Sequence, residues 1–451
     1  MRASDFRVKD RGVFPSGEAD KGLANDRPFV SVTPERVLLS ENQGGGGFVT
    51  FFVEKGMHVR RGQKIADPRN FTGTALHASV SGTVTDFVTM KMPNGERTFC
   101  VIEADADQPE MPDLPYMHQI VLPDRYKREG ILAAMKDGGI CGMGGAGFPA
   151  HIKYSADIDF DTLIINAMEC EPYLCCDHRM MLEHPYEFIN GALIMQKACG
   201  ADELVISTEE NKQDAADRLQ KIIDENSLKI RIVVREDKYP QGGEKQLIKQ
   251  VTGREVPSGG LPSDVNVVVS NVQTARAVSD MLYGGMPCMT RGITVTGEVR
   301  EPSNFLAPIG TPFTQLVEMA GGLKSVDTRI ILGGPMTGSL LAMGDEEHDL
   351  PGGLTKTSGG LIAVKDRTLV ESPCIRCGSC AAACPMGLRP FRINSAYLRN
   401  DLALCEMLEA TECIACGSCS FICPAKRELT HTSVSARDAV RAAVRERGDS
   451  K

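Results

Sequence analysis

Three absences limit what this chain can be. It has no tryptophan, no run that approaches the ~18 apolar residues of a membrane-spanning helix, and no N-terminal stretch that resembles a signal peptide. It is also short of positive charge, because 50 Lys and Arg residues stand against 59 Asp and Glu residues and give a net charge of −9. This balance argues against nucleic acid as a ligand and against electrostatic binding to anionic lipid. If the protein works at a membrane, we expect it to dock on a partner.

Cysteine is abundant, and one cysteine ladder occurs twice near the C-terminus. The copies are Cys374-Ile-Arg-Cys377-Gly-Ser-Cys380-Ala-Ala-Ala-Cys384-Pro385 and Cys413-Ile-Ala-Cys416-Gly-Ser-Cys419-Ser-Phe-Ile-Cys423-Pro424. The spacing C-x₂-C-x₂-C-x₃-C-P is the bacterial ferredoxin pattern, and two copies predict two [4Fe–4S] clusters. Three closely spaced cysteines can hold one cluster, whereas the fourth, which we expect where a helix begins, ligates the neighbouring cluster. The predicted ligand sets are Cys374, Cys377, Cys380 and Cys423 for one cluster, and Cys413, Cys416, Cys419 and Cys384 for the other.

Zinc and disulfides are the alternatives for these thiols. Zinc also binds sets of four cysteines, but zinc ribbons usually use two separated Cys-x₂-Cys pairs rather than an unbroken run closed by proline. Disulfides do not suit a chain that begins without a signal peptide. The iron–sulfur interpretation is therefore favoured, and it predicts a protein that moves electrons. The other cysteines show no ligand spacing and are expected to be small buried residues: Cys100, Cys141, Cys170, Cys175, Cys176, Cys199, Cys288 and Cys405.

Length and pattern predict a multidomain chain. Its 451 residues are too many for one core and predict roughly three to four domains. Residues 1–28 are polar and without periodicity, as in an extended arm. Short β-type runs punctuated by glycine then predict a small β domain over residues 29–120. Its sequence resembles the sandwich-hybrid fold of biotinyl and lipoyl domains, but Lys91 lies after the Ser-Gly-Thr-Val strand, unlike a biotinylated lysine.

Strands and helices alternate over residues 121–288. Strands are expected at residues 162–167, 203–207, 230–234 and 265–270, with helices at about 184–199, 211–225 and 243–251. Alternation at this spacing predicts a parallel sheet with crossover helices. Further units are expected in order: a β-rich domain over 289–350, a linker with a connecting strand over 351–371, a two-cluster α domain over 372–435 and a basic helix over 436–451. The basic face of that helix fits a solvated helix end or a docking contact.

A glycine-rich loop opens the α/β region. It reads Gly142-Met-Gly144-Gly145-Ala-Gly147-Phe-Pro, and Lys153 follows shortly after. Glycines let a backbone approach a phosphate, and a following helix N-terminus adds N–H donors. The loop is neither a Walker A sequence nor a good Rossmann fingerprint, since no strand clearly precedes it. From these residues alone, a phosphate cradle and a plain tight turn both remain open.

Four motifs in order resemble the NADH-oxidising flavoprotein subunit of respiratory complex I. The glycine loop is followed by Asn166-Ala-Met-Glu169-Cys-Glu171-Pro, then Tyr239-Pro-Gln-Gly242-Gly243-Glu244, then Ser270-Asn271-Val-Gln-Thr274. The resemblance implies a site for FMN and NADH, with Glu244 bordering the nicotinamide and acting on it by geometry and electrostatics. The cofactor-binding residues that it implies are Gly142, Gly144, Gly145, Gly147, Lys153, Asn166, Glu169, Glu171, Tyr239, Gly242, Gly243, Ser270, Asn271 and Thr274. The chain departs from complex I at Met168, an aspartate there, and at Gly243, a glutamate there.

Over residues 29–435 the chain is identified as a member of the RnfC family, the peripheral subunits of Rnf ferredoxin:NAD⁺ oxidoreductases. The domain order of that family is sandwich hybrid, flavoprotein-like, β-grasp and two-cluster ferredoxin, and residues 76–82 are similar to a characteristic segment of its first domain. The resemblance implies an oxidoreductase subunit that exchanges electrons between NADH, FMN and two [4Fe–4S] clusters. It implies a peripheral position on the cytoplasmic face of a bacterial membrane, membrane-embedded and iron–sulfur partner subunits, an indirect exchange with ferredoxin, and coupling to ion translocation.

Two alternatives stay open from sequence. A soluble cobalamin-reductase-like enzyme would carry the same cofactors, but its sandwich-hybrid domain follows the clusters, whereas here that domain comes first. The other alternative is an electron-relay subunit without its own nucleotide site. It stays open because Met168 and Gly243 depart from the complex I motifs.

Overall fold

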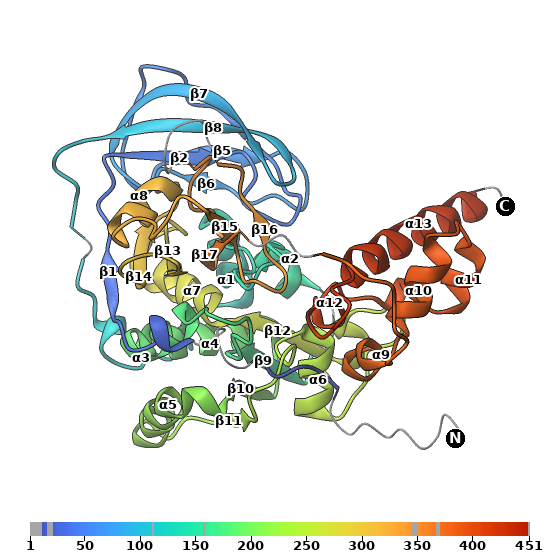
Figure 1. Ribbon diagram of the computed structural model, residues 1–451. Coiled ribbons are helices and arrows are strands. Elements are labelled where there is room, and N and C mark those ends of the chain that lie inside the picture. The colour runs from blue at the N-terminus through green and yellow to red at the C-terminus, as the bar shows by residue number, and fades with distance from the viewer. Residues whose placement is uncertain are drawn as a thin grey trace.

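The computed structural model describes residues 11–15, 21–110, 112–156, 158–343, 350–366 and 370–449. Within these ranges the strands form four sheets, and a group of helices at the C-terminus, drawn in orange and red, lies to one side of them (Figure 1). The multidomain α/β class expected from the sequence is confirmed. No helix in the described ranges combines the length and apolar character needed to cross a bilayer.

Two small antiparallel sheets make up the first β unit, at the top of Figure 1. Their strand orders are β2-β8-β7-β4 and β3-β5-β6. Buried aliphatic side chains such as Val37, Ile65 and Ile102 belong to one core that both sheets share with the α/β unit. The strands are β2 (Arg36–Ser40), β3 (Val49–Phe51), β4 (His58–Val59), β5 (Lys64–Pro68), β6 (Leu76–His77), β7 (Gly82–Met92) and β8 (Gly95–Ala104), and the 3₁₀ turns η2 (Lys21–Leu23) and η3 (Pro115–Met117) flank them.

A four-stranded parallel sheet in the order β11-β10-β9-β12 forms the next unit, as the alternating pattern predicted. Both faces are covered, since Leu163 and Ile165 pack on the side of α4 while Ile164 packs against α6. This explains why the strands are continuous apolar runs. The elements are α1 (Arg128–Asp137), α2 (Ala150–Ser155), β9 (Thr162–Asn166), α3 (Cys176–Glu183), α4 (Pro185–Cys199), β10 (Glu203–Glu209), η4 (Glu210–Lys212), α5 (Gln213–Glu225), β11 (Ile230–Arg235), α6 (Glu244–Thr252), η5 (Pro262–Val265), β12 (Val267–Asn271) and α7 (Val272–Gly284).

The third unit is a six-stranded mixed sheet in the order β1-β14-β13-β17-β15-β16, which corrects one expectation. β1 (Phe29–Ser31), expected to open the first β domain, pairs with β14 instead. β17 (Gly360–Lys365) lies within the range expected to hold a linker with a connecting strand, and it pairs with both β13 and β15 as a buried central strand of this sheet. The remaining elements are β13 (Thr290–Gly297), β14 (Ser303–Pro308), α8 (Phe313–Met319), β15 (Thr328–Leu332) and β16 (Ser339–Leu340).

The C-terminal unit is helical, and its last helix is longer than expected. α13 (Leu429–Asp449) begins seven residues before position 436 and buries Ala436 and Val440 against α10 and α11, so it belongs to the cluster domain rather than following it. On its basic face, Arg437 donates to the carbonyl of Cys413 at 3.0 Å and Arg441 to that of Thr411 at 2.8 Å. The basic residues therefore hold the second cysteine ladder. The other elements are α9 (Ser379–Ala383), α10 (Pro390–Tyr397), α11 (Leu402–Met407), η6 (Ala410–Glu412) and α12 (Ser418–Phe421).

One buried lysine joins the three sheet-containing units. Lys356 has no exposed surface. Its ammonium donates to Thr74 Oγ1 at 3.2 Å, to the carbonyl of Ala75 at 2.8 Å and to the carbonyl of Gly139 at 2.7 Å. Thr74 and Ala75 belong to the first β unit, Gly139 leads into the glycine loop, and Lys356 itself precedes β17. A charged donor with three acceptors satisfies the hydrogen-bonding needs of the group without water.

We expect Lys356→Met to lower the free energy of unfolding by about 3 kcal/mol, because two buried carbonyls lose a charged donor. Urea denaturation followed by circular dichroism measures this loss. The exposed Lys324 of the same sheet-containing unit is the matched control, and Lys324→Met should change the free energy by less than about 0.5 kcal/mol. Equal changes in the free energy of unfolding of the two variants would show that the hydrogen bonds of Lys356 do not stabilise the fold.

Candidate functional site

A cavity of about 510 Å³ lies where the carboxyl ends of β9 and β12 meet the glycine loop. That size is typical of small-molecule sites, and the carboxyl edge of a parallel sheet is where such sites occur. Asn166 and Asn271 end the two strands and reach the cavity. Ten of the residues implied by the complex I resemblance line it: Gly144, Gly145, Asn166, Glu169, Glu171, Tyr239, Gly242, Gly243, Glu244 and Asn271.

Five implied residues lie behind or beside the cavity wall: Gly142, Gly147, Lys153, Ser270 and Thr274. Thr274 accepts a hydrogen bond from the backbone N–H of Met143 at 2.8 Å, which fixes the glycine loop to the first turn of α7. Gly142 and Gly147 close the loop through a 3.0 Å backbone hydrogen bond. Lys153 forms an ion pair of 3.0 Å with Glu244, so two predicted site residues contact one another directly.

The two glutamates after β9 are held by the protein itself. Glu169 adopts a left-handed backbone conformation, with φ of 45°, and its carboxylate accepts hydrogen bonds from the N–H groups of Asp177 and His178 at the start of α3. Glu171 accepts hydrogen bonds from the N–H of Met336 and the hydroxyl of Thr337. Burial raises the pKa of Glu171. Both carboxylates therefore shape the wall between the α/β unit and the six-stranded sheet.

Several residues of the cavity wall were not predicted from the four motifs, because they come from other domains. The loop after β15 contributes Gly333, Gly334 and Thr337, and the second cysteine ladder contributes Ile414 and Cys416. The glycine pair before Pro335 is a visible signal, but nothing in the sequence says which cavity it faces. The remaining wall residues are Met143, Cys170, Leu174, Cys176, Asp177, Pro240, Lys245, Arg291, Thr357 and Gly359.

Asp177 is a buried carboxylic acid in the cavity wall. Burial and the neighbouring Glu169 raise its pKa to about 6. Its two carboxylate oxygens accept hydrogen bonds from Asn271 at 2.6 Å and from Gln273 at 2.8 Å, which oppose the shift. Asp177 thus connects the start of α3 to the start of α7.

Two small cavities in the C-terminal unit each gather four thiols. One is lined by Cys374, Cys377, Cys380 and Cys423, and the other by Cys384, Cys413, Cys416 and Cys419. These are the crossed sets predicted from the spacing. One detail of the prediction is wrong: Cys384 and Cys423 lie just after the short helices α9 and α12 rather than where a helix begins.

The two ladders fold alike because the same positions adopt left-handed conformations. Arg376 and Ala415 have φ of 58° and 57°, and Gly378 and Gly417 have φ of 81° and 80°. Two left-handed residues in each loop turn the first three cysteines toward a common centre. Non-glycine residues seldom adopt this conformation, so Arg376 and Ala415 mark a constrained site.

The cavity of the α/β unit and the nearer thiol cavity share a wall. Ile414 and Cys416 line both. Met336, from the loop that contacts Glu171, packs against Gly417 so closely that a Cβ at Gly417 would lie 2.6 Å from its carbonyl oxygen. The other thiol set reaches the surface, since Cys374 and Cys377 are exposed.

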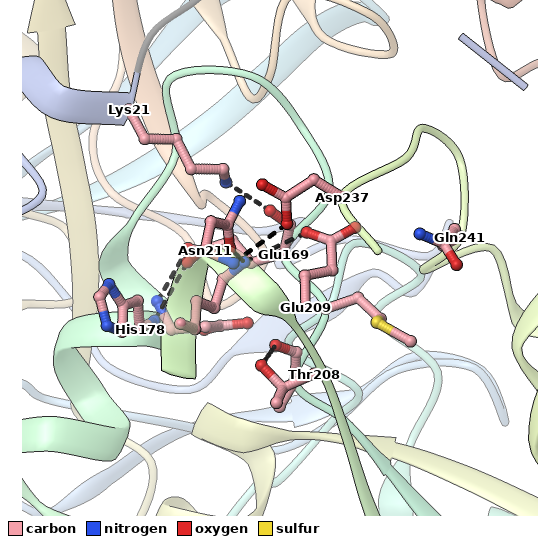
Figure 2. A network of polar contacts seen from close by, with 12 residues as sticks. Lys21, Glu169, His178, Thr208, Glu209, Asn211, Asp237 and Gln241 are labelled. Atoms are coloured by element: carbon pink, nitrogen blue, oxygen red, sulfur yellow. Dashed lines mark hydrogen bonds and ion pairs between the residues drawn. The ribbon is translucent and has the colours of Figure 1, made fainter. Parts of the chain in front are cut away.

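A network of polar side chains holds the loop that carries Glu169 and Glu171 (Figure 2). Lys21 donates from its ammonium to the carbonyls of Glu169, Glu171 and Leu174 at 2.5, 3.1 and 2.6 Å. Beneath it, Lys212 and Glu209 form an ion pair of 3.2 Å in which both side chains are at most 2% exposed. The segment before β1 therefore anchors the cavity wall.

We expect Lys212→Met to lower the free energy of unfolding by about 3–5 kcal/mol, because Glu209 is left as a buried charge without a partner. Removing both charges, in Lys212→Met with Glu209→Gln, should recover most of that loss. Urea denaturation of the two variants measures the difference. The exposed pair Lys221–Glu225 is the control, and Lys221→Met should have almost no effect. A double variant no more stable than the single one would refute this account.

Family models match three parts of the chain. The Nuo51 FMN-binding domain matches residues 135–280, the SLBB domain matches residues 293–339, and the RnfC barrel sandwich hybrid domain matches residues 10–107. The matched segments correspond to the α/β unit, most of the six-stranded sheet and the first β unit. The sandwich-hybrid domain thus precedes the flavoprotein-like domain, as the sequence predicts.

Three curated relatives are similar over most of their own length. The C component of the Na⁺-translocating ferredoxin:NAD⁺ oxidoreductase complex of Acetobacterium woodii is 38% identical, over 88% of this chain and 89% of that protein. The proton-translocating counterpart of Clostridium ljungdahlii is 36% identical, over 84% and 82%. The C component of the ion-translocating oxidoreductase complex of Rhodobacter capsulatus is 35% identical, over 87% and 75%.

Among solved structures, an NAD⁺-reducing [NiFe]-hydrogenase in its H₂-reduced state has a similar fold. The TM-score is 0.50 at 20% identity, and the match covers 68% of this chain and 61% of the hydrogenase chain. This likeness concerns the fold alone.

Proposed function

The chain belongs to the RnfC family of ion-translocating ferredoxin:NAD⁺ oxidoreductase subunits, and on that premise we propose that it is the NADH-linked electron-transfer subunit of such a complex. In this proposal it holds FMN in the main cavity and two [4Fe–4S] clusters in the thiol cavities. The observation that carries the proposal is the wall shared by the main cavity and the set of Cys384, Cys413, Cys416 and Cys419. NADH is the proposed substrate, and the reverse reduction of NAD⁺ uses the same groups.

The main cavity fits a flavin nucleotide. A Cβ at Gly145 would meet no atom within 4 Å, and Gly145 has φ of 116°, so the loop leaves open space beside the cavity where a side chain would be strained. A Cβ at Gly242 would lie 3.1 Å from Cys170 Sγ, so the wall there is closely packed. Bound FMN would supply the exchange between hydride and single-electron transfer. The glycine loop, Asn166 and Asn271 are the residues that would hold it.

Glu244 and Lys153 act at the entrance of the cavity. Their side chains are 43% and 32% exposed and form an ion pair. This pair holds the carboxylate at the first turn of α6, where the helix dipole favours a negative charge. We propose that Glu244 orients the dihydronicotinamide by hydrogen bonding and charge, without taking its proton.

The thiol sets define an inner and an outer end of the relay. Cys416 belongs to the inner set because it lines the main cavity, and Cys374 and Cys377 belong to the outer set because they are exposed. Ile375, which is 68% exposed, lies between them. Electrons can pass to another subunit only from a redox group close to the surface, and the outer thiol set is the one with exposed cysteines. We therefore propose that membrane-embedded and iron–sulfur subunits of the complex dock there.

The names of the relatives place them in multisubunit complexes that translocate protons or sodium ions. For this chain we propose a peripheral position on the cytoplasmic face of the membrane, with ferredoxin served through the partner subunits. The soluble cobalamin-reductase-like alternative is disfavoured, since the sandwich-hybrid match at residues 10–107 precedes the flavoprotein match. A relay without a nucleotide site does not explain a cavity with ten of the implied flavin residues in its wall.

Protein purified under nitrogen should contain about eight irons and one FMN per chain. Addition of NADH should bleach the flavin absorbance, because hydride reaches the ring in the cavity. Iron analysis, flavin release and visible spectroscopy make the test, with NADPH as a comparison nucleotide. Zinc in place of iron, or clusters without flavin, would contradict the proposal.

A matched pair of cysteine variants tests the inner and outer assignment. Cys416→Ser and Cys377→Ser should each lower the iron content by about four per chain. Only Cys416→Ser should shift the flavin absorption spectrum or weaken flavin binding, because Cys416 lines the main cavity. Equal effects of the two substitutions on the flavin would reject the assignment.

A further inference from the structure

A buried arginine of the six-stranded sheet reaches the main cavity. Arg291 lies in β13, is 3% exposed and lines the cavity wall. Its Nη1 donates to the carbonyl of Lys356, whereas its Nε is buried and has no hydrogen-bond partner. Among the described residues, no acidic side chain forms an ion pair with it, although the charge of Asp177 acts on it.

A buried cation without a counter-ion is unfavourable unless an anion joins it. Asp177 offsets part of this charge, because its carboxylate interacts electrostatically with the guanidinium, but its two oxygens accept hydrogen bonds from Asn271 and Gln273. The carbonyl of Lys356 is a neutral acceptor and adds no negative charge. The cavity wall thus contains a buried guanidinium whose Nε has no hydrogen-bond acceptor among the described residues.

The strand that carries Arg291 is joined to the start of a long helix. Gln273, in the first turn of α7, accepts a hydrogen bond from the N–H of Gly292 at 2.8 Å and donates one to its carbonyl at 3.2 Å. These bonds tie the residue after Arg291 to the N-terminus of the 13-residue helix. A helix N-terminus favours anions through its N–H groups and dipole, and arginine binds phosphate with a fork of donors. Thr357 and Gly359 also line this cavity.

We propose that Arg291 binds the phosphate of the flavin mononucleotide, an inference that rests on the proposed function. A buried arginine suits the phosphate of a cofactor that stays bound better than the pyrophosphate of a dinucleotide that must enter and leave. Arg291 is almost fully buried, whereas the ion pair of Lys153 and Glu244 is partly exposed at the entrance. The matched FMN-binding segment, residues 135–280, ends before Arg291, so the six-stranded sheet completes the flavin site.

The test compares two flavins that differ only in the phosphate. Flavin-free full-length protein, kept anaerobic, is titrated with FMN and with riboflavin, and binding is measured by quenching of flavin fluorescence. In Arg291→Gln, FMN affinity should fall about 10- to 100-fold while riboflavin affinity changes less than about 3-fold. Arg291→Lys keeps the charge and should fall between wild type and Arg291→Gln.

Lys245 supplies the control. It lines the same cavity but has an acidic partner, Glu412, at 3.9 Å. Lys245→Gln should leave the ratio of FMN to riboflavin affinity unchanged. Circular dichroism and thermal melting verify that each variant is folded, and Arg291→Lys serves if Arg291→Gln does not fold.

Three results would overturn the proposal in distinguishable ways. If wild type prefers FMN and folded Arg291 variants keep that preference, Arg291 does not bind the flavin phosphate, although the flavin site stands. A loss of NADH affinity with an unchanged flavin preference would assign Arg291 to the dinucleotide instead. If wild type binds neither flavin, the proposed function fails together with this inference.

Discussion

The ammonium of Lys356 is the contact on which the geometry of the main cavity depends. Its side chain holds the carbonyl of Gly139, just before the glycine loop, and two acceptors in the first β unit. Its own carbonyl accepts from Arg291. Lys356 thus joins the approach to the glycine loop, the first β unit and Arg291 of the six-stranded sheet. Because the group is fully buried, it can adopt few other arrangements without leaving a charged or polar atom unsatisfied.

Local patterns were enough to predict the parts of the fold that depend on local chemistry. The parallel strands are short apolar runs such as residues 162–166, and burial on both faces requires that composition. The thiol sets follow from cysteine spacing, because three cysteines in a tight loop have only one common centre. What could not be predicted also has a physical cause. A connecting strand was expected after the Gly-rich stretch, but the central place of β17 depends on its pairing with β13 and β15, from distant parts of the chain.

The candidate site shows the same division. Ten motif residues meet at the carboxyl edge of the parallel sheet, as the order of motifs implied. Arg291, Thr337 and Cys416 could not be placed from sequence, because no local rule says which cavity a residue on another sheet or loop will face. The roles of the two glutamates of the acidic motif also differ from what the resemblance implied. Glu169 and Glu171 accept hydrogen bonds from α3 and from the loop after β15, so they position the wall that other groups present to a ligand.

The linear order of the units gives the impression of modules that could be exchanged one at a time during evolution. The contact between Met336 and Gly417 argues otherwise. A Cβ at Gly417 would overlap the Met336 carbonyl, so a ferredoxin-like unit joined here must carry a glycine at that position. The loop around Met336 and the second cysteine ladder are therefore shaped to each other, and a change in the course of either loop would disturb the contact between the two units.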